Sequence, residues 1–145
     1  MVPIVAITAG DPTGVGPEIT ARVLPLAVRI ARPVVFGHLP TLAPWLERFA
    51  PGVGLRVADR VELPPPGGAT LVPCGPAGEP IRPGDGTAGR AQLECLDRAV
   101  AAVLGPLDTG ALVTAPVSKA AIAAVHPGFT GHTEHLAAAV GLPAD

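Results

Sequence analysis

The only lysine and the only serine of this chain are neighbours, Ser118 and Lys119. They follow a short apolar segment that ends at Pro116. Lysine is a compact point charge whose pKa shifts readily on desolvation, so Lys119 is a candidate catalytic residue. A serine beside a lysine could be a nucleophile with its base, although neighbouring side chains at a helix start tend to point apart. Ser118 could equally cap a helix, and the spacing leaves both interpretations open.

A second group of residues suited to chemistry follows: Gly131, His132, Thr133, Glu134 and His135. The glycine permits close approach of a ligand to the backbone, and the two residues after it offer polar contacts. Because His132 and His135 are three residues apart, they could share one face of a helix and bind a metal ion. No third ligand is evident nearby, so the spacing does not predict a complete metal site.

The third candidate is the glycine-rich segment 10–18, Gly-Asp-Pro-Thr-Gly-Val-Gly-Pro-Glu. It separates a predicted strand from a predicted helix, where an α/β sheet presents backbone N–H groups to a ligand. It is not a dinucleotide fingerprint, because Ile19 stands where the third glycine should be, and it lacks the Gly-Lys-Ser/Thr of a phosphate-binding loop. By itself the segment is either a tight structural turn or a ligand-binding loop.

Hydrophobic periodicity and turn residues predict the elements that position these groups. Strands are expected over residues 2–8, 33–37, 54–58, 69–72 and 110–114. Helices are expected over residues 17–31, 41–49, 87–104, 118–125 and 134–140. We expect Pro25 to kink or shorten the first helix. The alternation predicts a layered α/β fold with a largely parallel sheet, and it places Lys119 near the carboxyl ends of the strands, where ligands bind.

Composition excludes several classes of protein. The chain has 145 residues, about one domain by length, with 48% hydrophobic and 15% charged residues and a net charge of −2. Nothing resembles the basic stripe of a nucleic-acid-binding protein, and no apolar run is long enough to span a membrane. A chain with so few charges is expected to have part of its surface covered by a partner subunit or by further polypeptide.

The two cysteines and the first residues bear on the compartment. Cys74 and Cys95 show neither CxxC nor metal-ligand spacing, and we expect two buried thiols in a reducing compartment. The first residues lack the basic and apolar regions of a signal peptide. The expected location is therefore the cytoplasm.

Taken together, three motifs resemble the PdxA family of 4-hydroxythreonine-4-phosphate dehydrogenases: residues 7–18, 113–119 and 129–134. The strand over 33–37 and the helix over 89–104 support the resemblance. It implies an isocitrate/isopropylmalate dehydrogenase-like fold, incomplete in this chain, and a homodimeric enzyme that needs NAD or NADP and a divalent metal such as Zn, Mg or Co. In the family, 4-hydroxythreonine 4-phosphate is oxidised and decarboxylated to 3-amino-2-oxopropyl phosphate during pyridoxal 5′-phosphate (vitamin B6) biosynthesis.

The resemblance also assigns residues. The family's substrate contacts carry over onto His132 and Thr133, and the substrate would be a small phosphorylated hydroxy amino acid. Family members are about twice as long, so residues 1–145 correspond to the amino-terminal part. The metal ligands and most cofactor contacts would lie in the absent carboxyl-terminal half, so no metal ligand and no cofactor contact is assigned here. Alone, the chain is expected to be inactive, and its partner would be a second copy or a complementary carboxyl-terminal half.

Two other interpretations remain. A paralogue of the same family could act on 4-phosphothreonate or 4-phosphoerythronate, and the Gly-His-Thr-Glu motif would not separate it from the first interpretation. The chain could also be a non-catalytic remnant that folds or dimerises without turnover. Whether it is a truncated gene product, a split subunit or a fragment is not readable from these residues.

Overall fold

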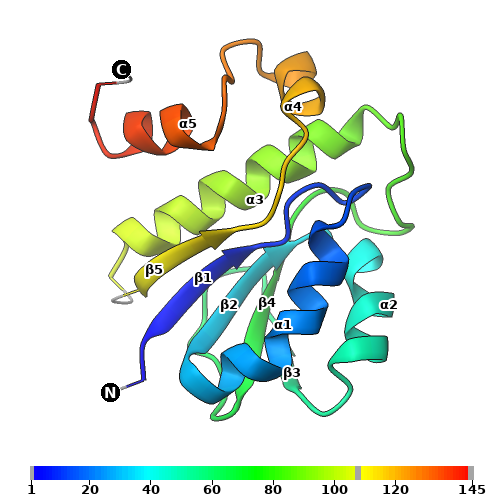
Figure 1. Cartoon of the computed structure of the whole chain (residues 1–145), viewed down its shortest axis with the longest axis vertical. Coiled ribbons are helices and arrows are strands. Elements are labelled where there is room, and N and C mark those ends of the chain that lie inside the picture. Colours follow the sequence, from blue (N-terminus) through cyan, green and yellow to red (C-terminus); the bar gives the residue numbers. More distant parts are fainter. Residues whose placement is uncertain (1, 107–108, 144–145) are drawn as a thin grey trace.

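The computed structural model describes residues 2–106 and 109–143 (Figure 1). The strands are β1 (Ile4–Thr8), β2 (Arg32–Gly37), β3 (Gly54–Val57), β4 (Gly68–Pro73) and β5 (Thr109–Thr114). The helices are α1 (Gly16–Ile30), α2 (Leu39–Phe49), α3 (Thr87–Leu104), α4 (Lys119–Val125) and α5 (His132–Ala139). Each of these elements overlaps one that the sequence predicts. No helix in the described part of the chain is long and apolar enough to cross a membrane.

The strands form one sheet in the order β3-β4-β2-β1-β5, and all four pairings are parallel. The predicted layered α/β fold with a parallel sheet is therefore confirmed. In the register of the sheet, Thr8 at the end of β1 lies opposite Phe36 in β2 and Thr114 in β5. The carboxyl ends of the central strands consequently meet at one edge, and the segments after β1 and β5, which carry the first two motifs, leave from there.

Alternate residues along the strands pack on opposite faces of the sheet, as the pleat requires. Ile7 and Val35 belong to a core cluster with α1 and α2, whereas Ala6 and Val34 belong to a cluster with α3. A third cluster joins α3 to α4 and to Phe129, just before α5. Helices α1 and α2 therefore cover one face of the sheet, and α3 covers the other and carries the two short helices (Figure 1).

Two expectations about the helices need correction. Helix α1 continues through Pro25 to Ile30, so the proline does not shorten it. Helix α5 begins at His132, two residues before the predicted start, because the Gly131 carbonyl already accepts a hydrogen bond from the His135 N–H at 3.1 Å. The histidine thereby lies in the first turn of the helix. The expected pair of buried free thiols is confirmed for Cys74 and Cys95.

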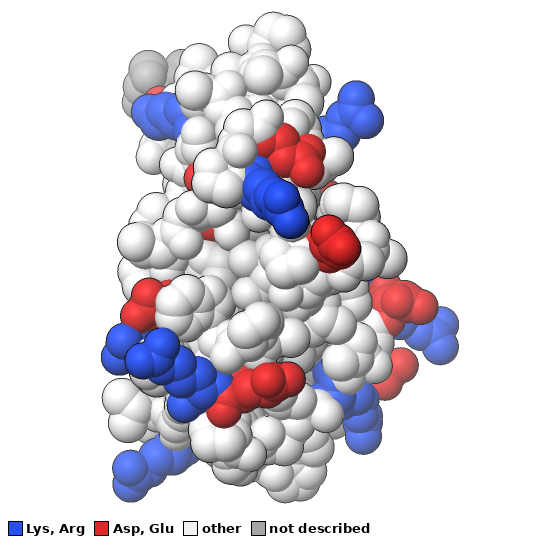
Figure 2. Space-filling model, turned by 90° about the vertical axis from the view of Figure 1, so that its right-hand side faces the viewer, with Lys and Arg blue, Asp and Glu red and all other residues white. Residues whose placement is uncertain are grey.

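Charged side chains are sparse and mixed on the side of the molecule shown in Figure 2, where blue and red groups lie next to one another in small clusters. Among the described residues, Glu18 and Arg22 form an ion pair at 2.7 Å. The visible face therefore carries no extended surface of one sign that would suit nucleic acid.

Candidate functional site

The glycine-rich loop after β1 packs directly against the segment that follows β5. The Asp11 N–H donates a hydrogen bond to the Pro116 carbonyl at 3.0 Å. Gly10 has φ 71°, and a Cβ placed on it would lie 2.2 Å from that carbonyl oxygen. Any other residue would therefore be both strained and in collision with Pro116. The structure thus brings the first and second sequence motifs together at the carboxyl ends of β1 and β5.

Polar groups of this loop are used within the loop itself. The Asp11 carboxylate accepts hydrogen bonds from the N–H and the hydroxyl of Thr13, each at 2.9 Å. A Cβ on Gly16 would lie 2.0 Å from the Ala9 carbonyl oxygen, so this glycine lets α1 start close to β1. These contacts support the interpretation of the loop as a tight structural turn.

Ser118 is the N-cap of α4. Its hydroxyl accepts a hydrogen bond from the Ala121 N–H at 3.2 Å, which satisfies one of the free donors of the first turn. Its own N–H donates to the side-chain oxygen of Gln92 at 2.7 Å. Gln92 is fully buried in α3 and also donates to the Ala88 carbonyl at 3.1 Å. The capping interpretation of Ser118 is confirmed, and α4 is held to α3 through a buried amide.

Lys119, the first residue of α4, extends toward the motif that opens α5. A Cβ built on Gly131 would lie 3.3 Å from both Cε and Nζ of Lys119 and 2.8 Å from the Glu134 carboxylate. The lysine side chain therefore crosses the backbone of Gly131, and a larger residue there would displace it. Lys119 and His132 lie 13 positions apart in the chain, but the fold brings them to one place.

His132 has an unusual environment. Its side chain is partly buried, and its Nε2 atom is inaccessible to solvent without a hydrogen-bond partner among the described residues. Burial lowers the pKa of His132 below its ordinary value, and the nearby His135 and Lys119 lower the pKa further. The lowered pKa favours the neutral form of the imidazole. Thr133, the next residue, is exposed.

The side chain of His135 bonds and packs against other residues of the fold. Its Nε2 donates to the Asp97 carboxylate of α3 at 2.6 Å, and its ring packs against Phe129 with centroids 5.5 Å apart. It thus fastens α5 to α3. Within residues 2–106 and 109–143, no three His, Cys, Asp or Glu side chains are grouped so that they could hold a metal ion. The His132–His135 spacing therefore does not produce a metal site from the described residues.

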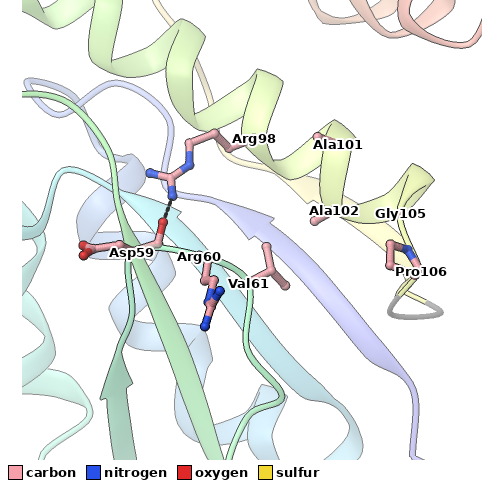
Figure 3. Close-up of a pocket in the computed structure, with 8 residues that line it drawn as sticks. All are labelled: Asp59, Arg60, Val61, Arg98, Ala101, Ala102, Gly105 and Pro106. Atoms are coloured by element: carbon pink, nitrogen blue, oxygen red, sulfur yellow. Dashed lines mark hydrogen bonds between the residues drawn. The ribbon is translucent and has the colours of Figure 1, made fainter.

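Two of the cavities bounded by the described residues are of interest, and neither is lined by Lys119 or His132. One, of about 760 Å³, is bounded by the β1–α1 loop, the start of α3, and α4, with Asp11, Thr87 and Ser118 among its lining residues. The other, of about 570 Å³, lies between residues 59–61 and the last turns of α3 (Figure 3). In Figure 3 the Arg98 guanidinium is bonded to the Asp59 carbonyl, so it fastens α3 to the loop after β3. No site residue predicted from the motifs lines this second cavity.

Gln92 and Asp97 were not identified as site residues from the sequence. Each positions a candidate: Gln92 holds the N–H of Ser118, and Asp97 holds the ring of His135. The sequence could have indicated a structural role for Gln92, because this polar residue stands four positions before Leu96, on the side of α3 that faces the core. The role of Asp97 could not be read from the sequence, since its partner His135 lies 38 residues further along the chain.

The chain is similar to a known protein family and to several of its members. The model of the family described as pyridoxal phosphate biosynthetic protein PdxA matches residues 31–144. A 4-hydroxythreonine-4-phosphate dehydrogenase of Chromobacterium violaceum is 39% identical over 142 residues, which cover 96% of this chain and 42% of the relative. The chain therefore spans less than half the length of this curated relative.

Solved structures agree with this match. The structure of a 4-hydroxythreonine-4-phosphate dehydrogenase from Burkholderia phymatum superposes with a TM-score of 0.81 at 28% identity, covering 99% of this chain and 45% of that one. A terephthalate 1,2-cis-dihydrodiol dehydrogenase from Burkholderia xenovorans also matches, with a TM-score of 0.64 at 28% identity, covering 97% of this chain and 41% of the other.

The family match covers most of the chain, and the sheet and helices follow those of solved family members. The expected isocitrate/isopropylmalate dehydrogenase-like fold is thereby confirmed. This chain belongs to the family of the pyridoxal phosphate biosynthetic protein PdxA.

Proposed function

We propose that residues 1–145 form the amino-terminal part of a 4-hydroxythreonine-4-phosphate dehydrogenase. The complete enzyme oxidises the 3-hydroxyl of its substrate with NAD or NADP, and the resulting 3-keto acid loses carbon dioxide to give 3-amino-2-oxopropyl phosphate in pyridoxal 5′-phosphate biosynthesis. The observation that carries the proposal is His132, whose buried Nε2 has no partner among the described residues and which follows Gly131 at the start of a helix. The names of the relatives supply the substrate class.

The roles of the candidate residues follow from their chemistry. A neutral His132 can hydrogen-bond a substrate hydroxyl or phosphate through the free ring nitrogen. Thr133 offers an exposed hydroxyl beside it. Lys119 supplies a positive charge next to Gly131, where it would attract the phosphate of the substrate. The three residues thus provide two hydrogen-bonding groups and one cation for a small phosphorylated hydroxy amino acid.

The cofactor and the metal ion belong elsewhere in this proposal. The described residues form no metal-binding group, so we place the ligands of the divalent ion, whether Zn, Mg or Co, in the part of the longer relatives that this chain does not match. Most NAD contacts would lie there as well, and we derive no step through either group. The complete enzyme is proposed to be a cytoplasmic homodimer.

The experiment uses the complemented chain, which we define as this chain co-expressed with the carboxyl-terminal part of the Chromobacterium violaceum relative that lies beyond the match. Replacing Lys119 by Ala should lower kcat/KM for 4-hydroxythreonine 4-phosphate at least about tenfold, or 1.4 kcal/mol. Lys119→Arg, which retains the charge, should lose less. If Lys119→Ala has wild-type kinetics, the lysine plays no part in the reaction.

A second candidate function is dehydrogenation of a related acid. One structural neighbour is named for a different substrate, so this fold accommodates more than one dehydrogenase reaction. Comparing 4-hydroxythreonine 4-phosphate with 4-phosphothreonate and 4-phosphoerythronate on the complemented chain separates the candidates. A higher kcat/KM for either acid would replace the proposed substrate, and no turnover of any of the three would favour a non-catalytic remnant.

A further inference from the structure

The only two cysteines of the chain come together in the fold. Cys74 directly follows β4, and Cys95 lies within α3, 21 positions further along the sequence. Each is 1% exposed, and both belong to the core cluster on the α3 side of the sheet. A single buried cysteine is an ordinary small core residue. Two cysteines that meet can undergo a reaction that neither can undergo alone, because they can join as a disulfide.

The two thiols touch each other and have few other polar partners. The Cys95 thiol is in hydrogen-bonding contact with the Cys74 thiol. The Cys74 thiol also donates to the Val72 carbonyl at 3.6 Å. Among the residues that the structure describes, no His, Asp or Glu side chain joins the pair to complete a group that could hold a metal ion. The contact therefore indicates chemistry between the two sulfurs.

Strand β4 and helix α3 approach each other closely around the pair. On one side, the Pro73 carbonyl accepts a hydrogen bond from the Arg98 guanidinium at 2.6 Å. On the other side, a Cβ built on Gly75 would lie 2.8 Å from the Cβ of Ala91. The two cysteines stand between these contacts in both elements. A disulfide needs Cβ atoms about 3.5–4.5 Å apart, and a strand and a helix in such close contact suit this requirement.

We propose that Cys74 and Cys95 form a reversible disulfide when the chain meets a peroxide, and that this bond cross-links β4 to α3. One sulfur, as thiolate, attacks hydrogen peroxide; the O–O bond breaks, hydroxide leaves, and the sulfur becomes a sulfenic acid. The second thiol attacks that sulfur, so that the S–S bond forms and water leaves. Two thiols thereby lose two protons and two electrons, and the peroxide is reduced to two molecules of water. A dithiol reductant reverses the reaction by exchange.

The surroundings of the pair make its oxidation slow. The hydrogen bond to Cys74 raises the pKa of the Cys95 thiol well above its ordinary value, and burial raises the pKa further. Because the thiolate is the reactive form, a protonated and buried pair reacts only during brief openings of the fold or with a small oxidant. The pair is thus protected against short exposure to peroxide and responds to sustained exposure.

The disulfide closes a ring that runs from residue 74 to residue 95. The ring contains the glycine- and proline-rich connection between β4 and α3, in which Gly84 and Thr87 line the cavity of about 760 Å³. A closed ring restricts the unfolded chain more than the folded one. Oxidation should therefore stabilise the fold and hold both ends of this connection in place.

The first test measures the equilibrium of the pair with glutathione. The isolated chain, starting either reduced or oxidised, is equilibrated with mixtures of reduced and oxidised glutathione, and the disulfide form is identified by the loss of two hydrogen atoms in its mass. The ratio of squared reduced to oxidised glutathione at half oxidation is the effective concentration of the two thiols. This value should be at least about tenfold higher in the native chain than in the chain unfolded by urea, because the fold holds the thiols in contact. An equal or lower value in the native chain would overturn the proposal.

The second test treats the isolated chain with hydrogen peroxide. Both thiols should disappear together, one peptide pair linked through Cys74 and Cys95 should be found after digestion, and dithiothreitol should restore both thiols. Cys74→Ser and Cys95→Ser are the matched controls: each retains one thiol and should give sulfenic or sulfinic acid without an internal disulfide. Circular dichroism checks that both variants are folded. Sulfinic acid on either cysteine of the wild type in place of the linked peptides, disulfides only between chains, or thiols that survive prolonged treatment would each refute the proposal.

Urea denaturation of the oxidised and the reduced chain tests the consequence for stability. The oxidised chain should unfold at a higher urea concentration, since the ring restricts its unfolded state. A lower midpoint after oxidation would show that the fold opposes the cross-link and would contradict the proposal. These measurements use the isolated chain and require no turnover, so the inference stands or falls independently of the proposed function.

Discussion

Among the described residues, His132 has a buried, unpaired ring nitrogen and a lowered pKa. Its Nε2 is buried without a partner among the described residues, and leaving a buried polar group unpaired costs about 1–3 kcal/mol. Its environment also disfavours the imidazolium, chiefly through burial. In the proposed function, a substrate group that bonds this nitrogen would recover part of that cost.

The charge state of His132 can be measured directly. In the isolated chain, NMR titration of the His132 ring should give a midpoint below that of a model histidine peptide, because burial disfavours its charged form. Lys119→Gln removes a nearby positive charge and should therefore raise the midpoint, but only in part, since burial remains. A midpoint that does not respond to Lys119→Gln would mean that the two side chains are not close in solution.

A kinetic comparison separates substrate contact from metal binding. In the complemented chain, His132→Gln should raise KM or lower kcat while the metal content stays unchanged, because the residue contacts substrate in our proposal. His135→Gln is the matched variant, since its ring bonds Asp97. Loss of metal in both variants, measured by atomic absorption, would show that the histidines form a metal site and that the substrate assignment is wrong.

Among single residues, the sequence predicted a candidate site residue where the residue type alone was informative. The rarity of Lys119 and the Gly-His-Thr-Glu pattern identified the two groups that the fold brings together. The contact between Lys119 and Gly131 was not predictable, because it depends on how α4 and the next loop pack on α3. The bond from Asp97 to His135 depends on the same packing.

At the scale of elements, α4 is a helix of seven residues, too short to be stable by itself. Its position depends on the Ser118 cap and on the buried Gln92 side chain, and through them it fixes where Lys119 starts. A Cβ on Gly89 of α3 would lie 2.0 Å from the Ala121 carbonyl oxygen, so the two helices touch at backbone distance.

Substitutions at the start of α4 should therefore reduce stability. Ser118→Ala removes the cap and should lower the free energy of unfolding by about 1 kcal/mol. Gln92→Leu leaves the Ser118 N–H unpaired and should cost about 1–3 kcal/mol. Urea denaturation of the isolated chain measures both, with Ser118→Thr, which retains a hydroxyl, as the control. Equal stability of Ser118→Ala and the wild type would contradict the capping role.

The elements themselves were largely predictable, because apolar periodicity and turn residues mark them. The predicted bounds of α3 are those of the structure, since its large apolar residues repeat at the helical period from Leu93 to Leu104. The start of α5 was misplaced by two residues, because Glu134 looked like the first-turn acid while Gly131 in fact provides the N-cap. The extent of α1 was predicted to within one residue at each end, but the expected shortening at Pro25 does not occur.

At the scale of the whole molecule, the parallel sheet follows from the alternation of elements, but the strand order does not. The order places β5 at an edge with one face bare. The low charge content had indicated a covered surface without locating it.

The central proposal is that residues 1–145 form the amino-terminal, substrate-binding part of a 4-hydroxythreonine-4-phosphate dehydrogenase like the longer relatives. The most direct measurement is NADH formation from 4-hydroxythreonine 4-phosphate and NAD in the presence of a divalent metal ion. We expect no turnover by the purified 145-residue chain and measurable turnover by the complemented chain, with a lower kcat or a higher KM in its His132→Gln variant. Metal-dependent turnover by the isolated chain, or none in a folded complex, would contradict the account.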